Sequence, residues 1–166
     1  MLRFEGVVRR LIWKLKYKFV WQVVEEIGGL MLEGLEKEVF KGFWREVEER
    51  RPVVVGVPLH WWRKNWRGFN QAEKVGGWLA ERWGLEVGRG WMERARYTKP
   101  QVKLKKEARA RNIRGVFRIR KKEEVGGKAI LLVDDVWTTG ETMRECGRVL
   151  KEAGASWVWG LTVARG

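Results

Sequence analysis

The chain has 166 residues, 45% hydrophobic and 34% charged, so it is long and apolar enough to bury one core. No apolar run approaches the roughly 18–20 residues of a membrane span, and the N-terminal residues show no secretory signal pattern. Cys146 is the single cysteine, which excludes an intrachain disulfide and a Cys-rich zinc site. These features predict a soluble, cytoplasmic protein with one domain over residues 1–166.

The chain is strongly basic, because 35 Lys and Arg residues stand against 21 acidic residues and give a net charge of +14. Such a balance favours polyanionic partners, either nucleic acid or small phosphorylated ligands. A G-rich coding strand is the alternative explanation, since the abundant Gly, Trp, Glu, Arg, Lys and Val all have G-rich codons. Under that bias a scarce residue is the more informative one, and Asp134 and Asp135 are the only aspartates.

The first fifty residues are predicted to be helical. Over residues 7–40, with a break near 16–18, apolar side chains recur every three or four positions. Residues 53–57 form a short β-branched run, which is typical of a strand covered on both faces. A loop rich in Arg and Trp follows, then a helix over 71–83 that ends at Gly84 and a weaker strand over 85–91.

The second half of the chain alternates strands with helix-length segments. Its predicted elements are a long basic loop (94–115) with a helical turn near 107–111, a strand (116–119), a turn (126–127), a second buried strand (129–133), an amphipathic helix (141–153) ended by Gly154, and a last strand (157–163). This order predicts an α/β fold: a mainly parallel sheet flanked by helices over residues 51–166, preceded by a helical N-terminal segment over 1–50.

Residues 130–142 (ILLVDDVWTTGET) have the layout of a ligand site, because parallel sheets bind ligands where a strand ends and a helix begins. Backbone N–H groups of the turn and the start of the helix make a cradle for one phosphate. Its further donors and its close-approach position are Thr138, Thr139, Thr142 and Gly140. Asp134 and Asp135 suit a vicinal diol, and a phosphate beside a diol is a ribose 5-phosphate. For the acid pair alone, a solvated start to a helix is the alternative.

The same thirteen residues resemble the signature of type I phosphoribosyltransferases, which bind phosphoribosyl pyrophosphate (PRPP) with magnesium. Residues 57–75 (VPLHWWRKNWRGFNQAEKV) and 98–117 (TKPQVKLKKEARARNIRGVF) are similar to two motifs of the ComF family within that superfamily, and residues 11–19 (LIWKLKYKF) also fit. Trp137 stands where the family usually has a smaller apolar residue. The resemblance implies Asp134 and Asp135 as the catalytic pair on the ribose hydroxyls, with magnesium bound through PRPP and not directly by the protein. The PRPP-binding residues it implies are Asp134, Asp135, Val136, Thr138, Thr139, Gly140, Glu141 and Thr142.

The resemblance assigns two further loops to the ligand. The pyrophosphate loop, beside the aspartates if the two buried strands are neighbours, comprises Pro58, Leu59, His60, Arg63 and Arg67. A solvated basic face is the alternative for its arginines and a surface role for His60, while Asn70 is expected to cap the next helix. The flexible loop that closes over substrate in the superfamily comprises Lys99, Gln101, Lys103, Arg109, Arg111 and Asn112. Its charges equally suit a strip that tracks nucleic-acid phosphates.

Two functions stay open. The ComF resemblance implies a protein that binds PRPP or ribose 5-phosphate and acts in DNA uptake during natural competence, with single-stranded DNA and an uptake helicase as partners. Rings and cations suited to strand binding are Trp61, Trp62, Arg63, Lys64, Trp66 and Arg67. The alternative is an active phosphoribosyltransferase that uses PRPP and an unidentified nitrogenous base. Many ComF proteins begin with a four-cysteine zinc ribbon, which is expected to be absent here; no membrane insertion is expected, and a homo-oligomer is left open.

Overall fold

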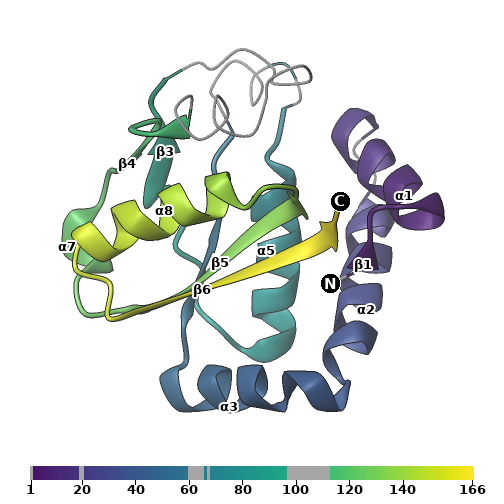
Figure 1. Ribbon diagram of the computed structural model, residues 1–166, viewed down its shortest axis with the longest axis horizontal. Helices are drawn as coiled ribbons and strands as arrows, with labels where there is room; N and C mark the ends of the chain where they lie inside the picture. The colour runs from purple at the N-terminus through teal and green to yellow at the C-terminus, as the bar shows by residue number, and fades with distance from the viewer. Residues whose placement is uncertain (1, 19–20, 60–65, 67, 97–112) are drawn as a thin grey trace.

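A computed structural model describes residues 2–18, 21–59, 66, 68–96 and 113–166 of the chain. Its centre is a parallel four-stranded sheet in the order β1-β6-β5-β2 (Figure 1). These strands are β1 (Leu2–Arg3), β2 (Val53–Gly56), β5 (Ala129–Trp137) and β6 (Trp157–Arg165). A separate antiparallel pair joins β3 (Met92–Arg94) to β4 (Phe117–Ile119). The predicted parallel sheet flanked by helices is confirmed.

Helices cover both faces of the sheet because β5 is apolar on both. Leu131 and Val133 pack with α1 (Gly6–Tyr17), α2 (Trp21–Leu35) and α5 (Gln71–Trp83). Ile130 and Leu132 pack instead with α8 (Glu141–Glu152). Successive side chains of a strand point to opposite faces, so an uninterrupted apolar run needs cover on both sides. The remaining helices are the 3-10 helix η1 (Glu38–Phe40), α3 (Lys41–Arg50) and α7 (Lys122–Val125).

The N-terminal segment is helical, with the break at the predicted place between α1 and α2. Its apolar stripe is buried at Val23, Val24, Ile27, Met31 and Leu35. Gly28 allows α2 to approach α5 closely, because a Cβ there would lie 2.2 Å from the Trp78 ring. The segment also supplies β1, a strand that the sequence pattern did not predict and that extends the sheet beside β6.

Most predicted element positions are confirmed, and two are corrected. The strand predicted over 85–91 is wrong: a single bridge joins Val87 to Val54, and Gly88 and Gly90, the latter at φ +70°, lead the chain away before β3 begins. The second buried strand does not stop before the acids, since pairing with β6 carries β5 on to Trp137. Helix α5 has the predicted bounds and ends at Gly84, whose φ is +60°.

Candidate ligand site at the carboxyl end of the sheet

The two buried strands are neighbours, as the pyrophosphate-loop prediction required. The register pairs Gly56 with Val133, and the N–H of Val57 donates to the Val133 carbonyl at 2.8 Å. Pro58 and Leu59 therefore leave β2 beside the start of the aspartate pair. His60, Arg63 and Arg67 lie outside the described residues, so their assignment stays a prediction.

Asn70 is structural, as predicted. Its side chain is buried, donates to the Val57 carbonyl at 2.9 Å and accepts from the Ala72 N–H at 3.1 Å, which caps α5. The end of β2 is pressed against the start of that helix, because a Cβ on Gly56 would lie 2.6 Å from the Glu73 nitrogen. The loop that leaves β2 is thus held at its base by α5.

Asp134 and Asp135 end the apolar part of β5 and diverge. Continuing the strand's alternation turns Asp134 toward the α8 face and Asp135 toward the α1 face. One contact agrees with this: Asp135 pairs with Lys16 of α1. Asp134 also turns back on the backbone, its Oδ1 accepting from the Asp135 N–H at 2.8 Å.

Burial raises the pKa of Asp134 to about 8, and repulsion from the Asp135 carboxylate adds to the rise. The hydrogen bond from the Asp135 N–H and the positive charge of Lys16 oppose it without cancelling it. The shift favours the protonated form of the Asp134 carboxyl, which can both donate and accept a hydrogen bond.

Lys16 is a site residue that the sequence analysis missed. Its Nζ lies 2.5 Å from Oδ2 of Asp135, and both side chains are half-buried. The lysine belongs to the LIWKLKYKF segment, yet nothing in that pattern shows which of its cations reaches the sheet. The contact brings the N-terminal segment to the same edge of the sheet as the acid pair.

The turn between β5 and α8 has the geometry of an anion cradle. Gly140 holds φ +78°, and no side chain caps the N-terminus of α8. Thr138 is exposed, while Thr139, Glu141 and Thr142 are partly exposed. Trp137 packs under the turn, because a Cβ on Gly140 would lie 2.4 Å from its Cζ2. Backbone N–H groups at such a helix start attract a phosphate.

Glu141 is paired within its own helix, and its predicted ligand role stays a prediction. Its carboxylate pairs with Arg144 at 2.7 Å, and the same guanidinium donates to the Thr139 carbonyl at 3.0 Å. The arginine thus ties the acid and the turn together, which keeps the Glu141 charge engaged within α8.

A hollow of about 310 Å³ lies beside Pro58 and Leu59. It is lined also by Arg94, Arg118 and Arg120. Arg94 belongs to β3, Arg118 belongs to β4, and Arg120 directly follows β4. The sequence analysis did not single out any of these arginines. Arg118 and Arg120 both pair with Glu93, the latter at 3.3 Å, so their positions are fixed within the small sheet.

In the sequence, β3 and β4 stand on either side of the predicted flexible loop. The residues of that loop lie outside the described part of the chain, so their assignment stays a prediction: Lys99, Gln101, Lys103, Arg109, Arg111 and Asn112. The C-terminal side of that segment is held by α8: buried Glu145 accepts from the Gly115 N–H at 2.7 Å and pairs with Arg148 at 2.8 Å. These contacts hold the pKa of Glu145 below its usual range. Next to it, burial raises the pKa of the Cys146 thiol, as expected for a small buried side chain.

The predicted nucleic-acid residues are only partly described. Trp61, Trp62, Arg63, Lys64 and Arg67 lie outside the described residues. The Trp66 ring is described, is well exposed, and meets Tyr17 of α1 edge to face.

Among the described residues, no group of three or more His, Cys, Asp or Glu side chains could hold a metal ion. The expectation that magnesium binds through PRPP, and not directly to the protein, stays a prediction. None of the described helices is long and apolar enough to cross a membrane.

The parallel sheet flanked by helices and the turn after β5 are typical of a phosphoribosyl transferase domain, and comparisons with known proteins agree with this class. The model of the phosphoribosyl transferase domain matches residues 63–164. The chain is 37% identical over 110 residues to DNA utilization protein YhgH of Escherichia coli O6:H1, covering 63% of this chain and 45% of that protein. It is 32% identical over 115 residues to Competence protein F of Haemophilus influenzae, covering 68% and 50%.

Among solved structures, the chain is similar to glutamine PRPP amidotransferase from B. subtilis, with 25% identity, a TM-score of 0.46, and 68% of this chain and 22% of that chain covered. The chain spans about half the length of the curated relatives it matches. It belongs to the phosphoribosyl transferase domain family, and within that family it is ComF-like.

Proposed function

We propose that the chain binds PRPP, or another ribose 5-phosphate compound, at the turn between β5 and α8. One observation carries this proposal: two adjacent aspartates follow the apolar part of β5, and an uncapped helix start lies directly beyond Gly140. The ribose hydroxyls donate to Asp134 and Asp135, and the 5-phosphate accepts from the backbone N–H groups and hydroxyls of 138–142. Magnesium, when bound with the ligand, neutralises charge on the pyrophosphate.

Asp135 is engaged before the ligand arrives, because Lys16 pairs with it. A ribose hydroxyl that binds Asp135 must share the carboxylate with this ammonium or displace it. The two oxygens of a carboxylate offer about four lone-pair positions, so sharing needs no break of the pair. The proposal therefore places Lys16 at the edge of the ligand, where its positive charge favours an anionic compound.

We extend the proposal to DNA uptake with binding of single-stranded DNA. The relatives named DNA utilization protein YhgH and Competence protein F support this role. The net charge of +14 supports a polyanionic partner. In this role the chain binds PRPP as a regulatory ligand and not as a substrate, so the site needs no acceptor base.

Phosphoribosyl transfer is the second candidate, favoured by the hollow that Arg94 lines beside Pro58. In that reaction the bond from C1 of the ribose to pyrophosphate breaks, a bond from C1 to a ring nitrogen forms, and the nitrogen loses its proton. Cations beside the departing pyrophosphate stabilise the charge that develops on it. Release of pyrophosphate in the presence of a panel of nitrogenous bases separates this candidate from a binding role.

The experiment is a calorimetric titration of PRPP and magnesium into the parent chain and the variant Asp134→Asn/Asp135→Asn. The amides keep the shape of the carboxyls but cannot ionise when a ribose hydroxyl binds, so ligand affinity should fall at least tenfold, or about 1.5–3 kcal/mol. The matched control, Glu48→Gln/Glu49→Gln, removes two exposed charges from α3, far along the chain from the turn. Equal affinity in the parent and the double Asn variant, with both folded in a thermal melt, contradicts the proposal.

A further inference from the structure

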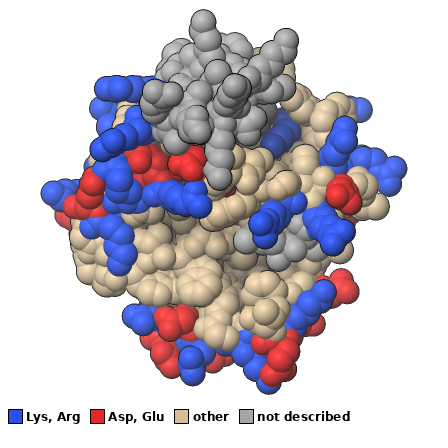
Figure 2. Space-filling view, in the orientation of Figure 1, with Lys and Arg blue, Asp and Glu red and all other residues tan. Residues whose placement is uncertain are grey.

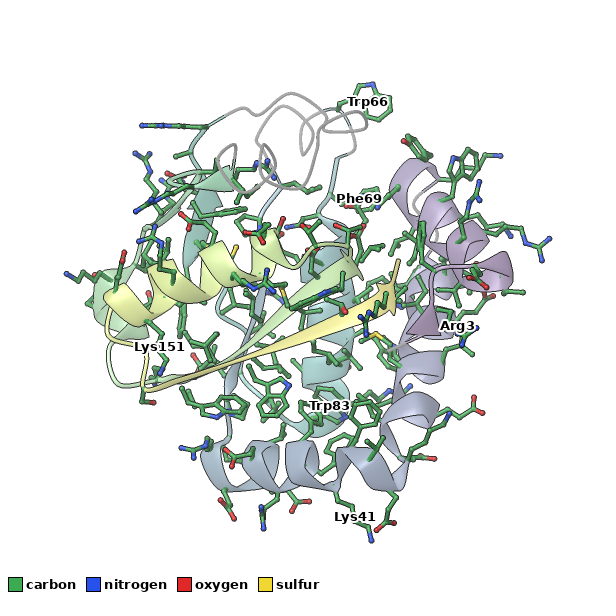
Figure 3. All side chains as sticks on the ribbon, viewed as in Figure 1. Arg3, Lys41, Trp66, Phe69, Trp83 and Lys151 are labelled. Carbon is green, nitrogen blue, oxygen red and sulfur yellow. The ribbon has the colours of Figure 1, made fainter. Side chains whose placement is uncertain are left out.

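Three aromatic rings form a row on the outer side of α1. The centroids of Trp13 and Tyr17, one helical turn apart, are 5.3 Å from each other, and Trp66 meets Tyr17 at 6.1 Å. These residues are 54%, 51% and 64% exposed. Figure 3 shows Trp66 projecting from the molecule on the side where α1 lies. Large faces of the three rings are therefore open to solvent, outside the core.

The helix that carries Trp13 and Tyr17 has charges of one sign. Helix α1 (GVVRRLIWKLKY) carries four basic residues and no acidic one. Arg9, Arg10 and Lys14 are exposed and, together with Trp13 and Tyr17, line a hollow of about 490 Å³. In Figure 2, Lys and Arg side chains lie over this side of the molecule, as they do elsewhere on the surface, with an acidic side chain among them. A hollow with rings and cations in its wall suits an anion that also carries flat apolar groups.

The face is presented on a rigid element. Leu11, Ile12 and Leu15, on the opposite side of α1, are buried in the core cluster that includes Val133 of β5. The Lys16–Asp135 pair ties the same helix to the end of β5. Because α1 is held in this way, its rings and cations keep their relative positions before any partner binds, which lowers the entropy that binding costs.

We propose that this α1 face, formed by Arg9, Arg10, Trp13, Lys14, Tyr17 and Trp66, binds single-stranded nucleic acid. The inference rests on the proposed role in DNA uptake and locates the surface that performs it. Bases stack on the exposed rings, and backbone phosphates lie along the cations. A single strand is favoured over a duplex, because only unpaired bases can leave their neighbours and stack on a side chain.

Two other occupants fit the face less well. A second copy of the chain would bring two surfaces of the same sign together in a molecule that already carries +14, which opposes association. A membrane surface requires a broad apolar face that can enter the lipid boundary, whereas Leu11, Ile12 and Leu15 of α1 are turned into the core and Val7 is its exposed aliphatic side chain.

The test is fluorescence anisotropy of a labelled 20-nucleotide oligo-dT with the full chain, at several salt concentrations. Trp13→Ala/Tyr17→Ala should weaken binding at least tenfold, since each stacked base is lost. Trp13→Phe/Tyr17→Phe keeps the stacking faces and should restore most of the affinity. The matched control is Trp159→Leu, which removes a 41% exposed ring that stacks on Trp157 in β6; it should bind like the parent.

A second pair of variants tests the cations. Arg10→Gln/Lys14→Gln should make the dependence of log affinity on log salt shallower by about 1.4, the value for two lost phosphate contacts on a single strand. Lys122→Gln/Lys128→Gln removes the same charge from exposed positions at the opposite end of β5 and should leave that dependence nearly unchanged.

The outcomes are distinguishable. If the parent binds and both α1 variants bind equally well, the α1 face is not the surface, while single-strand binding by the chain stands. If the parent does not bind at low salt, the DNA-binding part of the proposed function fails together with the inference. If the chain binds anionic vesicles through Trp13 and Tyr17 and does not bind the oligonucleotide, the partner of this face is a membrane and the proposal of nucleic acid is wrong. If the parent is a dimer and the Trp13→Ala/Tyr17→Ala variant is a monomer, the partner is a second copy of the chain and the proposal is also wrong.

Discussion

The β5–α8 turn and the outer face of α1 both present polar groups to solvent, but different forces hold them in place. In the turn, the backbone does the positioning: β5 is paired on both sides, and Gly140 reverses the chain into α8 over the Trp137 ring. On α1, long side chains project from a helix whose other side is buried, and their backbone is ordinary.

This difference predicts how each region responds to substitution. In a site built by the backbone, the N–H donors share one backbone conformation. A single added methyl group that changes this conformation can therefore displace all of the donors. A face built from exposed side chains loses binding in steps, because each ring or cation contributes separately and the fold does not depend on it. The turn should therefore be brittle and the α1 face tolerant.

The largest effect is expected at Gly140. Alanine there adds a Cβ at φ +78° and 2.4 Å from Cζ2 of Trp137, so the free energy of unfolding should fall by about 2–4 kcal/mol. In a Trp137→Leu background the same substitution should cost only about 1 kcal/mol, because the strained φ remains and the ring is gone. Urea denaturation of the four proteins measures both values.

Gly147→Ala, in the middle of the same helix, is the control, since its added Cβ meets only Val158 at an ordinary 3.9 Å. It should be neutral or slightly stabilising, because alanine favours the helix. A cost of Gly140→Ala that is the same in both backgrounds would show that the ring is not the obstacle.

The next effect concerns the charge of Asp134. Its pKa is about 8 in the folded chain against an ordinary value of 3.8, so between about pH 4 and pH 8 the folded state keeps a proton that the unfolded state has released. The free energy of unfolding attributable to this group therefore decreases as pH rises through that window and levels off above it. Asp134→Asn cannot titrate and should be more stable than the parent at pH 8.5 by about 1–2 kcal/mol, with little difference near pH 4.

Denaturant unfolding at pH 4, 6 and 8.5 checks this, with Glu48→Gln as the control for loss of one exposed carboxylate. The Asn side chain keeps an oxygen that accepts from the Asp135 N–H, so the comparison isolates the charge. A difference between variant and parent that does not grow with pH would be inconsistent with the raised pKa.

The sequence alone predicted the backbone-built region well. An apolar run of 129–133, the adjacent acids and a glycine before an amphipathic helix are local signals, and the structure has the strand, the turn and α8 in that order. It could not predict that β5 continues to Trp137, because that depends on pairing with a strand that comes later in the chain. The ligand roles of these residues remain predictions.

The α1 face could not be found in the same way. Tryptophans are abundant throughout the chain, so composition does not separate the exposed Trp13 and Trp66 from Trp78 and Trp91, which are buried in the core. Lys16 likewise resembles its basic neighbours until the fold brings it to Asp135. Contacts between residues far apart in the chain decide these roles, and no local periodicity records them.

The smallest effect tests whether the two regions are coupled. Lys16 and Asp135 form a half-buried ion pair between α1 and β5, and a double-mutant cycle with Lys16→Met and Asp135→Asn should give a coupling free energy of about 1 kcal/mol, lower at high salt. Because the lysine charge also lowers the pKa of Asp134, Lys16→Met should move the upper end of the Asp134 pH window further upward. Lys14→Met, on the exposed side of the same helix, should do neither. A coupling free energy of zero with an unmoved pH window would mean that this ion pair does not couple α1 to the turn.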